Sequence, residues 1–136
     1  MNAAINHTPV LDASIVLGEI AAILRRTDVL EERELAGTDT AADAATLDAL
    51  FERRMTLETL LPPMPATSPA DALGMITVAA GQMTFLLASE PDDNTIIVQQ
   101  RVYDLLASAA RCLAATLPTG DVAPVAPILK RYAAAS

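Results

Sequence analysis

The chain has 136 residues, of which 52% are apolar and only 3% aromatic, so its hydrophobic character comes from Ala, Leu, Ile, Val and Met. This length suits a single domain with a hydrophobic core of its own. A net charge of −8, with no basic stripe, disfavours binding to nucleic acid and to anionic membranes, because their phosphate groups repel an acidic chain.

Cysteine usage bears on the cellular compartment. Cys112 is the only cysteine, which excludes an internal disulfide and a zinc site built from several cysteines. The opening segment MNAAINHTPVLD has no Lys or Arg ahead of an apolar stretch, so it lacks the pattern of a signal peptide. We therefore expect a cytoplasmic protein.

The first predicted helix follows a frayed leader at residues 1–7. It begins either at Thr8-Pro9, where Thr can cap and Pro suits the first turn, or at Asp12 as a later N-cap. Apolar residues spaced four and three apart then continue to Leu35. Gly37 suits the left-handed position that ends a helix.

A second helix is predicted from Thr40 to the prolines at residues 62 and 63. Thr40 and Asp43 have the spacing of a capping box, and proline ends a helix because it has no N–H to donate. The short connection at Gly37 predicts an antiparallel hairpin of the first two helices. The apolar stripe of the second helix consists of Leu47, Leu50, Leu57 and Leu61.

Four prolines lie between residues 60 and 74, and they predict a turn between two helices. Ser68 is a good N-cap, Pro69 suits the first helical position and Asp71 places an acid in the first turn. These signals predict a third helix from Pro69 to about Ser89. The segment is therefore a stiff turn and not a linker, and residues 1–136 are expected to form one domain.

The stretch Pro65-Ala66-Thr67-Ser68-Pro69-Ala70-Asp71-Ala72-Leu73 resembles a turn that joins two helices in small uncharacterised all-helical proteins of high-GC bacteria. The shared features are turn residues rich in Ala, Thr and Pro. The resemblance implies a helical bacterial protein. It implies no known activity, and no functional residue is carried over from it.

Small residues line one face of the third helix at Gly74, Thr77 and Gly81. Each Gly costs about 1 kcal/mol relative to Ala inside a helix, so a packing reason is expected. We predict that this ridge makes a close helix contact, either within the chain or across a dimer. The uncharged stretch 72–89 around it is short and contains polar residues, which favours a buried helix over a membrane span.

A fourth helix is predicted from Asp92 or Asp93 to Leu117, followed by a short C-terminal helical segment in PILKRYAAA. Its apolar stripe places Cys112 inside the core as a small hydrophobic residue. The expected fold is an all-α bundle of four main helices, paired as antiparallel hairpins, plus the C-terminal segment. The stripe consists of Val98, Val102, Leu105, Leu106, Ala109, Cys112, Leu113 and Leu117.

Two arginine pairs, one on each of the first two helices, lie at similar distances from the turn at Gly37. Arg26 and Arg54 are predicted to frame an anion or a partner's carboxylate. The alternative is that these arginines form ordinary surface ion pairs, which contribute little. The acidic partners available for such pairs are Glu19, Glu52 and Glu58.

No pattern in the chain predicts catalysis, a cofactor or a metal site. The only histidine, His7, lies in the leader, so Cys112 has no predicted base. There is no Gly-rich phosphate loop. The acidic run from Asp28 to Glu34 could supply oxygen ligands for Mg²⁺, but such runs are usually solvated faces.

We therefore predict a non-enzymatic interaction module that self-associates, as a homodimer, through apolar helix faces and can present its acidic surface to a protein partner. The alternative is a domain that binds a small molecule in an apolar pocket between the third and fourth helices. Gln82, Thr84, Tyr103 or an arginine would supply its polar contacts. Methionines either fill the core or line such a groove, and they are Met55, Met64, Met75 and Met83.

Overall fold

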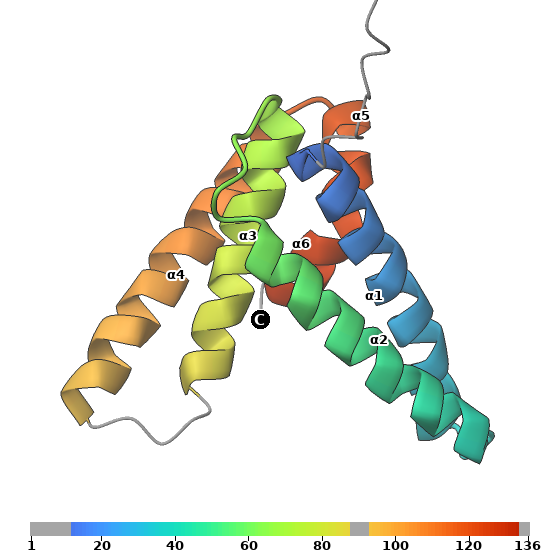
Figure 1. The fold of residues 1–136 in the computed structure, drawn as a ribbon. Coiled ribbons are helices and arrows are strands. Elements are labelled where there is room, and N and C mark those ends of the chain that lie inside the picture. Colours follow the sequence, from blue (N-terminus) through green and yellow to red (C-terminus); the bar gives the residue numbers. More distant parts are fainter. Residues whose placement is uncertain (1–11, 88–92, 134–136) are drawn as a thin grey trace, which may run out of the picture.

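The computed structural model describes residues 12–87 and 93–133, and every regular element in these ranges is helical. Two long hairpins are followed by a short helical C-terminal part (Figure 1). The predicted all-α bundle of four main helices with a C-terminal helical segment is confirmed. The elements are α1 (Ala13–Leu35), α2 (Ala41–Leu60), α3 (Pro69–Leu87), α4 (Asp93–Thr116), α5 (Thr119–Val122), η1 (Ala123–Val125) and α6 (Ala126–Tyr132).

Local signals set the ends of the first hairpin. The carboxylate of Asp12 accepts a hydrogen bond of 2.9 Å from the backbone N–H of Ile15, so α1 begins at the later of the two predicted caps. The leader and the alternative start at Thr8-Pro9 lie outside the described residues. Thr40 and Asp43 form both bonds of the predicted capping box, and Gly37 has the expected positive φ of 70°.

The turn between α2 and α3 is held by the carboxylate of Asp71. Asp71 Oδ2 accepts hydrogen bonds from the backbone N–H and the hydroxyl of Thr67, at 3.1 and 3.0 Å. The backbone N–H of Asp71 donates in turn to Ser68 Oγ at 3.1 Å, which confirms the predicted helix start. These bonds fix the direction in which α3 leaves the turn.

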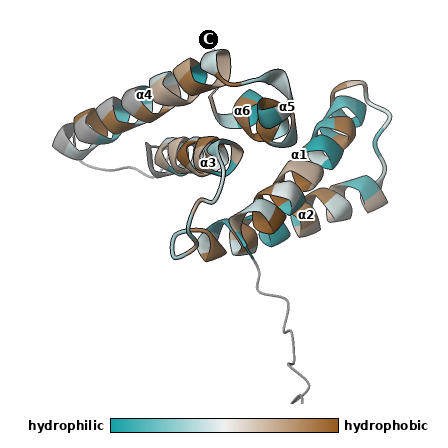
Figure 2. Cartoon of the chain, turned by 90° about the horizontal axis from the view of Figure 1, so that it is seen from above, coloured by the Kyte–Doolittle hydropathy of each residue, from teal (hydrophilic) through white to brown (hydrophobic). Residues whose placement is uncertain are grey.

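The two hairpins diverge from this turn, and α6 lies between them (Figure 1). Seen from above, α6 stands between α3 and α1 and contacts both (Figure 2). The core therefore forms where α1, α3 and the C-terminal part meet. Its most completely buried side chains are Val16, Leu17, Ile20, Leu24, Leu73, Thr77 and Ile128.

The second helix contributes less to this core than its stripe predicts. Leu57 and Glu58 are the buried residues of α2, and the cap residue Leu61 is buried beside them. Leu47 and Leu50 are only half-buried. Both side chains line a hollow between α1 and α2, so α1 covers them only in part.

The predicted burial of Cys112 in the stripe of α4 is wrong. Cys112, Ala109 and Leu113 are exposed, whereas Ala107 and Ala110 are buried. Buried alanines allow α4 to approach α3 closely. Of the larger residues in the predicted stripe, Val102, Leu106 and Leu117 are half-buried.

The ridge of small residues lies inside the fold. A methyl group built on Gly74 would contact Leu17 of α1 and Val125 of η1, and one built on Gly81 would come closer than 3.0 Å to the ring of Tyr132. Thr77 between them is fully buried, and its hydroxyl donates to the carbonyl of Leu73 at 2.7 Å. Within the described residues, the partners of the ridge are therefore other helices of the same chain.

No helix in the described ranges combines the length and the apolar character needed to cross a lipid bilayer.

The Gly81 contact generates a stability prediction. Gly81→Ala should lower the free energy of unfolding by about 1–3 kcal/mol, because the added methyl group overpacks against the Tyr132 ring. Gly18→Ala is the matched control, since a methyl group at Gly18 of α1 meets no atom within 4 Å. It should raise the stability by about 0.5–1 kcal/mol through helix propensity alone. Urea denaturation measures both changes, and equal effects of the two variants would contradict the packing.

Candidate ligand-binding cleft

A cleft of about 580 Å³ opens between the diverging hairpins. This volume lies within the range of about 300–1,000 Å³ that is typical of small-molecule sites. Its walls come from four helices, α2, α3, α4 and α6. The lining residues are Phe51, Arg54, Met55, Glu58, Gly81, Gln82, Thr84, Tyr103, Arg131 and Tyr132.

The backbone geometry of two helices positions the walls. Residues 51, 54, 55 and 58 follow one another at the three- and four-residue spacing that places side chains on one helix face. Phe51 on this face is exposed, whereas Glu58 is buried beside Tyr132 of α6. On the opposite side, Gly81 lets the ring of Tyr132 lie directly on the backbone of α3, so that Tyr132 reaches the middle of the cleft.

A hydrogen bond joins the two sides of the cleft at its buried end. The hydroxyl of Tyr132 donates to Glu58 Oε1 at 2.7 Å, and Glu58 is only 4% exposed. The hydroxyl of Tyr103 on α4 donates to the backbone carbonyl of Tyr132 at 3.3 Å. Three helices are thereby tied to one another through Tyr132.

Burial controls the ionisation of both partners in this bond. Loss of solvent raises the pKa of Glu58 above its usual 4.5, while the Tyr132 hydrogen bond and the charge of Arg54 act in the opposite direction. Burial, followed by the bond to Glu58, also raises the pKa of Tyr132. Tyr132 therefore remains neutral and donates its proton to the hydrogen bond at any ordinary pH.

Arg54 places a positive charge against this pair. Its side chain is 12% exposed, and its guanidinium lies 5.3 Å from the ring centroid of Phe51 and 5.9 Å from that of Tyr132. The nearest carboxylate is Glu58, whose Oε1 is 3.9 Å from Arg54 Nε, too far for a hydrogen bond. Among the described residues, Nε of Arg54 has no hydrogen-bond partner. A buried charge of this kind is an unusual feature that calls for a partner.

The second cation among the described lining residues, Arg131, is already paired. Arg131 of α6 makes two hydrogen bonds to Glu31 of α1, at 3.0 and 3.3 Å. This fork-to-fork geometry is the strong form of the arginine–carboxylate interaction. Arg131 therefore holds α6 against α1, and Arg54 is the cleft arginine whose donors are not fully used.

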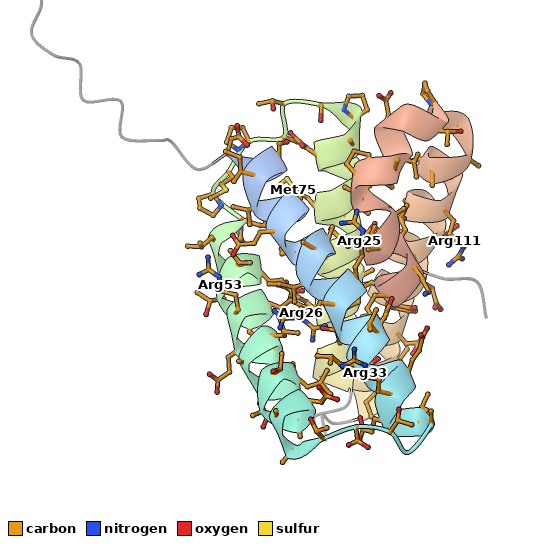
Figure 3. The ribbon with its side chains drawn as sticks, turned by 90° about the vertical axis from the view of Figure 1, so that its right-hand side faces the viewer. Arg25, Arg26, Arg33, Arg53, Met75 and Arg111 are labelled. Atoms are coloured by element: carbon orange, nitrogen blue, oxygen red, sulfur yellow. The ribbon has the colours of Figure 1, made fainter. Side chains whose placement is uncertain are left out.

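Arg54 lines the cleft and the hollow between α1 and α2, and Arg26 lines neither. Arg26 lies on α1 and is exposed, and it does not line the cleft, whereas Arg53 pairs with Glu19 at 2.8 Å (Figure 3). Two of the predicted acidic partners therefore do lie beside arginines of α2: Glu19 beside Arg53, and Glu58 beside Arg54. The difference between the two pairs is burial, because the Glu19 pair is solvated and the Glu58 pair is not.

The predicted polar contacts of a pocket, Gln82, Thr84 and Tyr103, do line the cleft. The cleft lies between the hairpins, however, and not only between α3 and α4. Sequence reasoning missed Glu58 and Tyr132. The regular spacing of Phe51, Met55 and Glu58 was the available signal for the first of these, but nothing local marks a tyrosine near the C-terminus as a cleft residue.

In residues 12–87 and 93–133, no group of three or more His, Cys, Asp or Glu side chains is arranged to hold a metal ion. The acidic run from Asp28 to Glu34 is divided between ion pairs to Lys130 and Arg131 and exposed positions.

Comparison with protein-family models, with curated proteins and with solved structures gives no match. The resemblance of residues 65–73 to small bacterial helical proteins stays a prediction.

The raised pKa of Glu58 predicts a pH dependence of stability. The native state retains this proton at pH values where the unfolded state has lost it, so the stabilisation is complete below about pH 4.5 and is lost as the pH rises through the native pKa. Relative to Glu58→Gln, which keeps an acceptor for Tyr132 but does not ionise, the wild type should lose stability between about pH 4.5 and neutrality.

Urea denaturation of both proteins across this pH range measures the effect. Glu52→Gln is the control, because Glu52 lies on the exposed side of the same helix. A stability difference between wild type and Glu58→Gln that stays constant, or that grows in favour of the wild type as the pH rises, would contradict the buried position of Glu58.

Proposed function

We propose that the protein is a non-enzymatic binding domain whose ligand is a small molecule held in the cleft. The observation that carries this proposal is the side chain of Arg54, a nearly buried cation between two aromatic rings with an unused Nε donor. A buried charge of this kind is normally stabilised by a hydrogen-bonded group of opposite charge. Because Arg54 lines the cleft, a ligand in the cleft can supply that group.

The walls of the cleft support an organic ligand. Phe51, Met55 and the ring of Tyr132 supply apolar surface, and Met55 adds a flexible side chain that adapts to the shape of a ligand. Gln82, Thr84 and Tyr103 supply a few polar groups at defined positions. Apolar walls with a small number of convergent polar groups are typical of small-molecule sites.

Binding without catalysis fits these groups. Tyr132 remains protonated and donates its proton to Glu58, so Tyr132 does not act as a general base. Cys112, the one thiol of the chain, is exposed on α4 and does not line the cleft.

Self-association as a homodimer is the second candidate. It is favoured by the exposure of Phe51 and Leu60 on α2, at 47% and 38%, since this helix packs mainly against α1 and leaves apolar side chains uncovered. In either case we place the protein in a bacterial cytoplasm, where a single free cysteine remains reduced.

A neutral fluorescent probe, phenylnaphthylamine, tests the cleft. Thr84→Trp should weaken binding of the probe about tenfold or more, because the indole occupies volume at the rim of the cleft. Thr56→Trp is the matched control. Both threonines are exposed on helices and donate a hydroxyl to the carbonyl four residues earlier, but Thr56 does not line the cleft. Equal affinities of the two variants, or no binding to the wild type, would refute the proposal.

Light scattering tests the second candidate. The dimer proposal predicts a mass of two chains that decreases toward one chain in Leu60→Asp, because a carboxylate in the interface would be desolvated. A single-chain mass for the wild type at all concentrations would refute it.

A further inference from the structure

Three cleft properties bear on the chemical class of the ligand: the charges that line it, the hollow on the far side of Arg54, and the ionisation of Glu58.

The charges of the lining favour an anion. Arg54 and Arg131 face one acid, Glu58, and Arg131 is already neutralised by Glu31. The net charge of the described lining therefore depends on Arg54 and Glu58: it is zero while Glu58 is ionised and positive once Glu58 is protonated, in a chain whose net charge is −8. A single available guanidinium, unaccompanied by a second free cation among the described lining residues, suits a carboxylate or sulfonate better than a doubly charged phosphate.

A second hollow, of about 230 Å³, determines the side from which an anion approaches Arg54. It shares Phe51, Arg54 and Arg131 with the cleft, but its other walls carry Glu31, Glu34 and Asp48. These acids repel an anion on that side. On the cleft side the neighbours are apolar rings and Glu58, so the open route to the guanidinium runs through the cleft.

Glu58 is the one acid among the described lining residues that an anion would meet there. It shares its surroundings with Arg54 on its own helix, with Arg131 and Tyr132 on α6 and with Tyr103 on α4, while α3 contributes no charged side chain to the lining. An anion that approaches Arg54 comes close to the carboxylate of Glu58. Two negative charges in a poorly solvated space favour protonation of one of them.

We propose that the cleft binds an organic acid with an apolar body, that Arg54 holds its anionic group, and that Glu58 takes up a proton as the acid binds. This proposal rests on the proposed binding function and adds a ligand class and a proton coupling to it. Protonated Glu58 releases Arg54 from its weak ion pair and removes the charge that repels the ligand. The affinity for the acid then rises as the pH falls.

Two probes with the same ring system separate the anionic group from the apolar body. Anilinonaphthalene sulfonate carries a sulfonate that is ionised at every relevant pH, and phenylnaphthylamine lacks it. Arg54→Gln should weaken binding of the sulfonate about ten- to a hundredfold, the factor expected for a charge-assisted hydrogen bond, and leave the neutral probe nearly unchanged. Arg53→Gln removes the same charge one residue away and should affect neither probe. For each probe, binding in the cleft is taken as the part of the fluorescence signal that the wild type shows and Thr84→Trp does not.

Proton uptake is measured by calorimetry of sulfonate binding in buffers of different ionisation enthalpy near neutral pH. The wild type should take up a fraction of a proton per bound sulfonate, and Glu58→Gln should take up none. The sulfonate itself binds no proton, so the uptake reports on Glu58. Glu58→Gln should also bind the sulfonate more tightly at neutral pH than the wild type, while Glu52→Gln behaves as the wild type.

Circular dichroism verifies folding, and Arg54→Lys replaces Arg54→Gln if the latter is unfolded. Lysine keeps the charge without the planar donor group and should weaken sulfonate binding to a smaller degree.

The outcomes are distinguishable. If both probes bind in the cleft and Arg54→Gln leaves the ratio of their affinities equal to that of Arg53→Gln, the organic-acid proposal is overturned and the binding function stands. If Arg54 matters but wild type and Glu58→Gln take up equal numbers of protons, the proton coupling is overturned. If the neutral probe does not bind in the cleft, the binding function fails and the ligand class fails with it.

Discussion

The hydrogen bond between Tyr132 and Glu58 is the constraint on which the arrangement of the cleft depends. It joins the last described helix to the second one, across a sequence separation of 74 residues. The ring of Tyr132 rests on the backbone of α3 at Gly81, and its carbonyl accepts a bond from Tyr103 of α4. One side chain thus sets the distance between hairpins that otherwise diverge. Without it, α2 would lose the hydrogen bond that ties it to α6.

The same bond has an electrostatic consequence. Burying Glu58 raises its pKa and leaves a carboxyl group whose charge is only weakly compensated by Arg54, 3.9 Å away. Buried ion pairs with imperfect geometry rarely add stability, because desolvation offsets the attraction between the charges. Such a pair is more easily explained as part of a binding site than as a structural element. The aromatic rings on either side of Arg54 then orient the guanidinium and also supply apolar surface for a ligand.

Local chemistry made the helices predictable. The side chains of Asp12, Thr40 and Ser68 each accept a hydrogen bond from the backbone N–H three residues later. Because these bonds are local, the sequence alone locates the three helix starts. Burial on α2 and α4 was less predictable, since it depends on how the hairpins are placed. Cys112 faces solvent because alanines form the close contact with α3, and Leu47 and Leu50 stay half-buried because they line a hollow between α1 and α2. The cleft is harder still to foresee, because Arg54, Glu58 and Tyr132 meet only after α6 has taken its place between the hairpins.

The central claim is that the space beside Arg54 holds a small organic acid and not a second protein chain. Native mass spectrometry of the protein taken directly from its source cells measures the oligomeric state and any retained ligand together. The account predicts one chain with one bound molecule, which is released as an acid on denaturation and is lost in Arg54→Gln. A dimer without a bound small molecule would contradict it.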